Sequence, residues 1–257
     1  MNDQLVPVLT YHSVGDGPGG GIEPYRTATD MFREHVDALT DSGRTWVTIS
    51  ELGRRLRDDE SVAGLGAVTF DDPYADAIDN ALPVLAAASV PATVYSVSDG
   101  LGSVPPFGRE GPVLATAEQL GDLGSGVEVG AHSVDHPEMD TLGARGAQRQ
   151  IASSRAALED LTGRPVTSFA YPHGYRSRQT MRLVRDEGLV AACGVGNALS
   201  HQRDDRFSIA RILVTREHGS DDIARMCAGR GYPAARSRDR LATVGWRWAR
   251  RIRRVIR

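Results

Sequence analysis

The run Ala67-Val68-Thr69-Phe70-Asp71-Asp72 is an apolar stretch of strand length that ends in two carboxylates, and it decides the fold class. A stretch with helical periodicity follows from residue 74 to about residue 88, and a second strand-like run covers residues 92–97. A strand, a helix and another strand in this order are typical of a βαβ unit, in which the two strands are parallel. The sequence therefore predicts an α/β fold built around a parallel sheet.

The same alternation extends toward both ends of the chain. Seven or eight β/α units in about 220 residues predict a (β/α) barrel with seven or eight strands. We expect one barrel domain over residues 1–222 and a basic amphipathic C-terminal segment over residues 223–257. The other expected strands cover residues 6–11, 46–49, 127–131, 167–171, 190–195 and 209–214, and the other expected helices begin near Thr29, at a cap on Ser50, and near residues 117, 144 and 178.

Composition places the chain among ordinary globular proteins. Its 257 residues are 40% hydrophobic, 25% charged and 6% aromatic, which excludes the disordered, collagen-like and coiled-coil classes. No apolar run approaches the roughly 20 residues that span a bilayer. Asp3 stands where a signal peptide would carry basic residues, so we expect a cytoplasmic protein. Cys193 and Cys227 form no Cys-x-x-Cys pair, so we expect neither a disulfide framework nor a thiolate zinc site.

Charge is distributed unevenly along the chain. Residues 229–257 hold ten Arg and one Asp, a charge of +9, whereas the remainder holds 20 Arg and 32 acidic residues, a charge of −12. Apolar side chains recur every three or four positions near the C-terminus, which predicts a basic amphipathic helix. Such a helix binds an anionic membrane surface, or it packs on the acidic body of the same chain. No recognition motif accompanies the charge, so we expect no nucleic-acid partner. The apolar positions are Leu241, Val244, Trp248, Ile252 and Val255.

Polar residues stand directly at the carboxyl ends of several expected strands. His12 follows the first strand, Asp71 and Asp72 end the third, and His132 and His173 follow later ones. In a β/α barrel the carboxyl ends of the strands form one face, so we expect these side chains to converge there. A hydrophobic core needs neither imidazoles nor carboxylates, so this face is a candidate active site.

His132 and His136 are four residues apart, a spacing that lets both imidazoles bind one cation if the segment turns helically. Solvated histidine pairs have the same spacing, and an aspartate at a strand end often caps the next helix. Together with the carboxylates of Asp71 and Asp72, however, the imidazoles supply the donors of a catalytic zinc site and a spare carboxylate as general base. Cobalt, nickel, manganese and iron are alternatives to zinc at such a site.

Three runs carry a family signature: residues 68–72 (VTFDD), residues 130–137 (GAHSVDHP) and residues 169–174 (FAYPHG). In order and spacing they resemble the motifs of the polysaccharide deacetylase family, also called the NodB-homology family or carbohydrate esterase family 4. Residues 7–14 (PVLTYHSV) are similar to the opening of the family branch with an N-terminal Tyr-His motif. The resemblance covers roughly residues 5–215 and implies a distorted (β/α) barrel.

The resemblance also implies a metal-dependent hydrolase that removes N- or O-acyl groups, most often acetyl from N-acetylglucosamine units. The expected substrate is an N-acetylated amino sugar in a polysaccharide, an oligosaccharide or a lipid-linked sugar. Two alternatives stay open: a non-catalytic module that binds a carbohydrate or a partner on the same barrel, and an O-deacetylase or deformylase of an amino sugar. The presence of both Asp and both His residues favours the enzyme.

The resemblance implies a role for each motif residue. Asp72, His132 and His136 hold the divalent cation, and Asp71 is the base that takes a proton from the metal-bound water. Ser133 lies behind these ligands and orients the segment that carries them.

Other roles concern the substrate and the leaving group. The resemblance implies that the backbone N–H of His173 stabilises the oxyanion and that Tyr171 and Pro172 contact the substrate. For the general acid that protonates the leaving amine we favour His12. His201 and the side chain of His173 are the alternatives.

Two positions depart from the family pattern. Pro73 follows the Asp pair where the family usually has Gly, so the turn into the next helix must differ. Ala170 stands where many members carry an Arg that pairs with the base, so this motif supplies no partner for Asp71.

Overall fold

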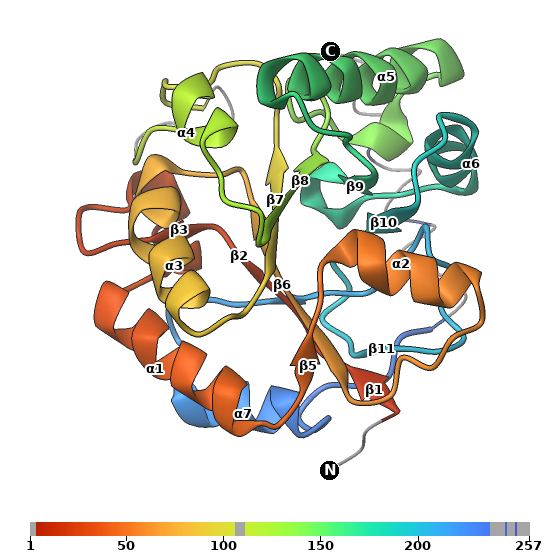
Figure 1. Cartoon of the computed structure of the whole chain (residues 1–257). Coiled ribbons are helices and arrows are strands. Elements are labelled where there is room, and N and C mark those ends of the chain that lie inside the picture. Colours follow the sequence, from red (N-terminus) through yellow and green to blue (C-terminus); the bar gives the residue numbers. More distant parts are fainter. Residues whose placement is uncertain (1–3, 106–110, 237–244, 246–249, 251–257) are drawn as a thin grey trace.

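The computed structural model describes residues 4–105, 111–236, 245 and 250, and its centre is a parallel sheet (Figure 1). The sheet strands are β2 (Val8–Tyr11), β5 (Thr45–Trp46), β6 (Leu65–Asp71), β7 (Ala92–Ser96), β8 (Val127–Ala131), β9 (Ser168–Ala170), β10 (Ala191–Cys193) and β12 (Ile212–Leu213). Their order is β10-β9-β8-β7-β6-β2-β12, with β5 paired to β6. A single parallel bridge between Cys193 and Ile209 joins β10 to the segment before β12. The sheet is therefore curled and only partly closed, which confirms the predicted distorted barrel.

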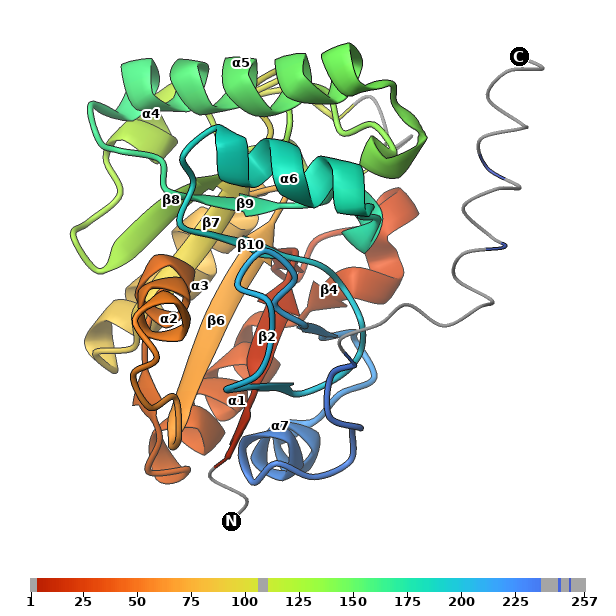
Figure 2. The ribbon, with the colours of Figure 1, turned by 90° about the vertical axis from the view of Figure 1, so that its right-hand side faces the viewer.

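Helices surround this sheet, as Figures 1 and 2 show. α1 packs against α7, and α5 packs against α6. Two short strand pairs lie beside the main sheet, β1 with β11 and β3 with β4. The bounds of these elements are α1 (Thr29–Asp41), α2 (Ile49–Arg57), α3 (Ala75–Ala87), α4 (Ala117–Gly121), α5 (Ala144–Thr162), α6 (Arg178–Asp186), α7 (Ser220–Cys227), β1 (Leu5–Val6), β3 (Ser13–Val14), β4 (Arg26–Thr27) and β11 (Ser200–His201), with short 3-10 helices η1 (Gly20–Tyr25), η2 (Met139–Thr141) and η3 (Pro172–Gly174).

The local sequence explains why these elements form. All seven residues of β6 are buried, as expected for a central strand of a parallel sheet that is covered on both faces. α1 instead buries one stripe at helical spacing, which includes Phe32, Val36 and Leu39, and turns its charged residues outward. The continuous apolar run of β6 and the helical spacing of apolar residues in α1 are both visible in the sequence.

α2 differs from its prediction at its first turn. Thr48, rather than Ser50, is the N-cap, because its side-chain oxygen accepts the backbone N–H of Glu51. Ser50 instead donates its own N–H to Glu128. The expected strand over residues 46–49 ends at Trp46, since α2 already begins at Ile49, and the expected strand over residues 209–214 is reduced to the two residues of β12.

The C-terminal part of the domain includes one helix that the sequence analysis did not predict. α7 places Ile223, Met226 and Cys227 in the hydrophobic core. The expected domain boundary after residue 222 thus falls inside α7. The predicted basic amphipathic helix lies outside the described residues except for Gly245 and Arg250. Among the described residues, no helix combines the length and the hydropathy needed to cross a bilayer.

Candidate metal centre

The polar residues at the carboxyl ends of the strands converge as predicted. β6 ends at Asp71, and β8 ends one residue before His132. Asp72, His132 and His136 each offer a ligand atom within 4.8 Å of the others, and all three residues are buried. The parallel direction of β6 and β8 is what brings these sequence-distant groups to one edge of the sheet.

The separations of the polar atoms suit a shared cation. The Nε2 atom of His136 lies 3.6 Å from Oδ2 of Asp72, and Nε2 of His132 lies 3.9 Å from Oδ1 of the same carboxylate. These separations are too long for hydrogen bonds, but they suit donors that surround one ion at about 2 Å each. The buried Oδ1 of Asp72 has no hydrogen-bond partner among the described residues. Two imidazole nitrogens and one carboxylate oxygen form a donor set typical of zinc, so the residues present fit a divalent cation.

The tautomer of His132 is set by the neighbouring strand. Its Nδ1 lies 2.8 Å from the carbonyl oxygen of Ala170, at the end of β9. Because that carbonyl can only accept, Nδ1 carries the proton and Nε2 keeps its lone pair toward Asp72. An outer hydrogen bond of this kind orients a ligand imidazole and raises its basicity.

Backbone strain is concentrated around the same groups. Asp72, Ser133, His136 and His173 all have positive φ, between 49° and 70°, and they are four of the seven such non-glycine residues in the described chain. Each left-handed residue costs on the order of 1–3 kcal/mol, so the surrounding structure must hold it in place. Ser133 contributes to this, because its Oγ accepts the backbone N–H of His136 at 3.1 Å.

A buried arginine pairs with Asp71, and the sequence analysis did not identify it. Arg211 is fully buried, and its two terminal nitrogens each donate to one oxygen of Asp71 at 2.6 Å. It also donates to Oγ1 of Thr69 and to the carbonyl of Gly194. Arg211 thus supplies the partner that Ala170 cannot. The available signal was a lone charge inside the apolar run of residues 209–214.

The two adjacent carboxyl groups have opposite electrostatic environments. Burial disfavours the charge of Asp71, but the Arg211 guanidinium outweighs it and holds the pKa of Asp71 at about 2. Burial and the charge of Asp71 raise the pKa of Asp72 well above its ordinary value. A bound cation would compensate this penalty on Asp72.

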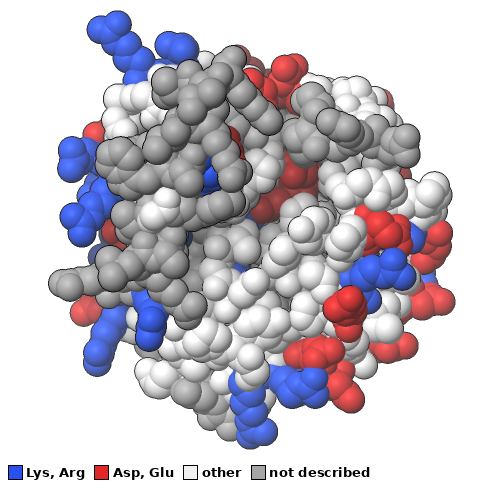
Figure 3. Space-filling view, turned by 180° about the vertical axis from the view of Figure 1, so that it is seen from behind, with Lys and Arg blue, Asp and Glu red and all other residues white. Residues whose placement is uncertain are grey.

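Figure 3 shows the rear face of the molecule, where acidic side chains lie in a recess near the middle while acidic and basic side chains alternate toward the right-hand edge.

The imidazoles of the two candidate metal ligands, His132 and His136, are neutral at pH 7. Burial lowers the pKa of His132 to about 4. Burial, together with the neighbouring imidazoles of His132 and His173, lowers the pKa of His136 to about 2. A neutral imidazole is the form that binds a metal ion, so no proton has to be displaced at neutral pH.

Of the candidate general acids, His12 lies at this site and His201 does not. His12 is close enough to lower the pKa values of Asp71, His132 and His136 through its charge, and burial lowers its own pKa. His201 belongs to β11, which pairs with β1 before the amino end of β2. There its Nε2 lies 3.1 Å from the carbonyl oxygen of Ala235.

The third motif divides between the site and the core. The ring of His173 lies 4.4 Å from the ring of His136, so its side chain faces the site. Gly174 permits this turn, since it has φ +71° and a Cβ there would come within 2.5 Å of the backbone nitrogen of Val195. Tyr171 and Pro172 are buried, and the Tyr171 hydroxyl donates to the carbonyl of Phe207 in the core. As placed, neither of these two side chains is available to the substrate they were predicted to contact.

Pro73 is accommodated by a neighbouring segment. The N–H of Asp72 donates to the carbonyl of Tyr95, and the carbonyl of Pro73 accepts the N–H of Ala115 at 2.7 Å. α3 then begins at Ala75. The turn is thus closed by hydrogen bonds to other segments and does not need glycine at position 73.

Comparisons with known proteins identify the family of this chain. The family model described as polysaccharide deacetylase matches residues 60–192, just over half of the chain. YxkH of Bacillus subtilis, which carries a polysaccharide deacetylase designation, is 25% identical over 212 residues, which are 82% of this chain and 71% of YxkH. The chitooligosaccharide deacetylase of Azorhizobium caulinodans is 28% identical over 143 residues, which are 55% of this chain and 62% of that protein.

Solved structures share the fold. The deacetylase PplD of Streptococcus pyogenes, solved in complex with acetate, has a TM-score of 0.73 at 18% identity, over 87% of this chain and 98% of PplD. The polysaccharide deacetylase BC0361 of Bacillus cereus also has a TM-score of 0.73, at 22% identity, over 87% of this chain and 69% of that structure.

Proposed function

The chain belongs to the polysaccharide deacetylase family, and we propose that it hydrolyses the N-acetyl group of an N-acetylhexosamine unit in a polysaccharide, an oligosaccharide or a lipid-linked sugar. One observation carries the proposal: two neutral imidazoles and the buried carboxylate of Asp72 converge beside a second carboxylate, that of Asp71. Three ligands with a separate base are the minimum equipment for metal-assisted hydrolysis.

Asp72, His132 and His136 would hold a divalent cation, for which zinc suits the donor set best. When bound, the cation supplies Lewis acidity, which polarises the acyl carbonyl and makes water more acidic. The raised pKa of the Asp72 carboxyl and its unpartnered Oδ1 support this assignment, because both features disappear when a positive charge is present.

Asp71 acts as the general base in this proposal. Arg211 holds both of its oxygens and keeps the carboxylate ionised. Oδ2, which lies 3.9 Å from Nε2 of His132, faces the reacting groups and accepts a proton from the water that attacks the acyl carbon. Because the bidentate pair fixes the carboxylate plane, the base needs no reorganisation during the reaction.

His12 acts as the general acid. When the carbon–nitrogen bond breaks, the departing amine needs a proton, and the imidazole of His12 donates it. Burial lowers the pKa of His12, so His12 must first take up a proton from solvent, and its protonated form is then a strong donor to the amine. The backbone N–H of His173 stabilises the oxyanion of the tetrahedral intermediate.

Residues through the end of α7 make up the catalytic domain in this proposal, since α7 contributes to the core.

The test is acetate release from N-acetylglucosamine oligomers by metal-stripped protein, with and without added zinc. We expect release that depends on zinc and is lost in Asp71→Asn. The matched control is Asp135→Asn, because Asp135 is exposed in the same loop as the two histidines and its side chain accepts a hydrogen bond from Gln150, away from the candidate ligand atoms. Release that is unchanged after metal removal would contradict the assignment. Tight zinc binding without release would favour a non-catalytic module.

A further inference from the structure

A cation is seated beside the candidate active site, and it comes from the C-terminal part of the chain itself. The guanidinium of Arg250 donates through Nη2 to Oδ2 of Asp140 at 2.5 Å. Its central carbon lies 3.4 Å from the centre of the Tyr175 ring. Asp140 is only 1% exposed and Arg250 only 6% exposed. A carboxylate and an aromatic face therefore enclose one positive charge.

Asp140 and Tyr175, which we call the cation seat, lie next to the candidate metal ligands and catalytic residues. Asp140 belongs to η2 and follows the metal-ligand candidate His136 by four residues. The ring of Tyr175 lies 5.6 Å from the ring of His173, which lies 4.4 Å from that of His136. The charges of Asp140 and Arg250 both act on His173, which places the seat against the same side of the site.

The seat has the chemistry of an ammonium site. A buried carboxylate is strongly disfavoured unless a cation pairs with it, and an aromatic face adds attraction for a positive charge. Tyr175 also offers a flat apolar surface of the kind on which a sugar ring packs. The proposed reaction converts a neutral acetamide into an amine, which is protonated near neutral pH. The chain therefore makes, next to this seat, a product of the class that the seat accepts.

We propose that Asp140 and Tyr175 form a subsite for the protonated amino group of an already deacetylated amino sugar, and that Arg250 occupies it as an internal competitor. The inference rests on the proposed function, because the free amine is the product of that reaction. The ammonium donates to Oδ2 of Asp140, where Nη2 of Arg250 now donates. The protein then favours chains that already carry a free amine next to an acetylated unit, and removal of Arg250 exposes the subsite.

Direct binding tests the subsite without relying on catalysis. A fully deacetylated glucosamine trimer and its N-acetylated counterpart are titrated calorimetrically into the full chain at about pH 6, where a primary amine is protonated. We expect Arg250→Gln to bind the deacetylated trimer about tenfold more tightly than the wild type. Asp140→Asn should bind the deacetylated trimer at least about tenfold more weakly than Arg250→Gln does. Tyr175→Leu should also bind this trimer more weakly than Arg250→Gln does. The affinity for the N-acetylated trimer should change less than about twofold in Arg250→Gln and Asp140→Asn, whereas Tyr175→Leu, which also removes a surface for the sugar ring, should weaken both trimers.

Two controls make the outcome decisive. Asp135→Asn removes an exposed acid from the same loop and should behave as the wild type. If Asp140→Asn does not fold, as judged by circular dichroism, Arg250→Gln and Tyr175→Leu still test the subsite. Unchanged affinity for the deacetylated trimer in Arg250→Gln, or equal gains for both trimers, would overturn the proposal and leave Arg250 as a structural contact.

The failure of this inference can be told apart from failure of the proposed function. If no substrate releases acetate but the trimer binds as expected, the subsite stands and the deacetylase proposal falls. If acetate is released but the three variants bind the deacetylated trimer as the wild type does, the subsite falls and the deacetylase proposal stands.

Discussion

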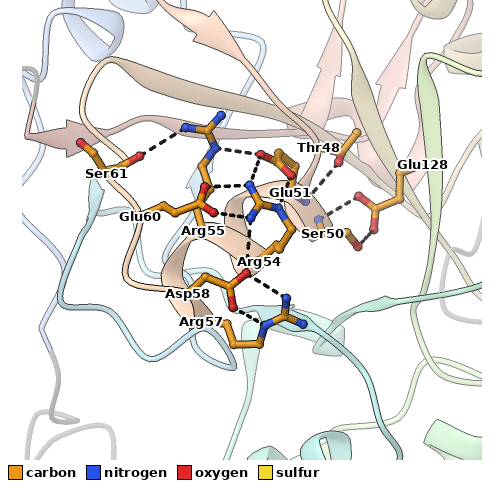
Figure 4. Close-up of polar contacts among 10 residues, drawn as sticks. All are labelled: Thr48, Ser50, Glu51, Arg54, Arg55, Arg57, Asp58, Glu60, Ser61 and Glu128. Carbon is orange, nitrogen blue, oxygen red and sulfur yellow. Dashed lines mark hydrogen bonds and ion pairs between the residues drawn. The ribbon is translucent and has the colours of Figure 1, made fainter.

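Carboxylates lie at both ends of the sheet, but they differ in how completely they are hydrogen-bonded. At the amino end, Glu128 is fully engaged, as it accepts the N–H of Ser50 at 3.0 Å and the hydroxyls of Ser50, Thr93 and Ser168 at 2.5 to 3.0 Å. Figure 4 shows Glu128 with Ser50, and beside them Arg54 of α2 joined to Glu51, Asp58 and Glu60. At the carboxyl end, Asp72 keeps a buried oxygen without a hydrogen-bond partner in the described chain.

The difference separates stability from chemistry. Buried polar groups that are fully hydrogen-bonded fix the packing of the elements that carry them, as Glu128 fixes the start of α2 over β8 and β9. Strained backbone and an unpartnered carboxylate persist only where something else compensates them, and ligand binding is the usual reason. The polar network at the amino end therefore fixes how the elements pack, and the carboxyl end is where we propose that a cation and a substrate bind.

The largest expected effect is on activity at the carboxyl end. Asp71→Asn should lower kcat/KM for acetate release by about 10²- to 10⁴-fold, since the proton acceptor is lost. Glu128→Gln should leave kcat/KM per folded molecule unchanged, because Glu128 lies at the other end of the sheet. Steady-state assays on both variants, corrected for the folded fraction, check this contrast. A comparable loss of kcat/KM in Glu128→Gln would contradict the division of roles between the two ends of the sheet.

The next effect concerns stability and comes from the ion pair of Asp71 with Arg211, which is both buried and part of the candidate active site. Arg211→Met leaves the buried carboxylate of Asp71 unpaired and should lower the free energy of unfolding by about 3–5 kcal/mol. Arg211→Lys should lose less, because it keeps the charge but not the bidentate geometry. Urea denaturation of the metal-free variants measures both values. A loss below about 1 kcal/mol in Arg211→Met would show that the pair is not needed for stability.

The pH dependence of stability tests the buried imidazole of His132 at the carboxyl end. Burial lowers the pKa of His132 from 6.5 to about 4, so the unfolded chain binds more protons than the folded chain between these values. The contribution of His132 to stability is complete above pH 6.5 and is lost as the pH falls toward 4. Metal-free wild type should therefore lose stability over this window relative to His132→Gln, as followed by thermal unfolding at several pH values. Parallel curves would contradict the neutral, buried imidazole.

The smallest expected effect is at the amino end. Glu128→Gln replaces an acceptor of several hydrogen bonds with an amide and should lower the free energy of unfolding by about 1–3 kcal/mol. Guanidinium denaturation measures this change, and Glu118→Gln on the exposed face of α4 is the matched control. An unchanged midpoint in Glu128→Gln would mean that the polar network does not hold α2 in place.

The sequence predicted the carboxyl end better than the amino end, for a physical reason. Local patterns mark where a strand ends, and parallel pairing then brings Asp72, His132 and His136 together. The Arg211 partner of Asp71 could not be placed, because a charge in an apolar run reveals burial but not its counterion. The contacts of Ser50 with Glu128 and of Arg250 with Asp140 join residues 78 and 110 positions apart, and no local pattern encodes such pairs.

Zinc stoichiometry is the most direct test of whether the carboxyl end forms a metal centre. Metal-stripped wild type, His136→Ala and Glu128→Gln are each reconstituted with zinc and freed of excess ion, and the bound metal is measured by mass spectrometry. Our interpretation predicts one zinc per chain for wild type and Glu128→Gln, and none for His136→Ala. Equal zinc in all three proteins, or none in the wild type, would contradict it.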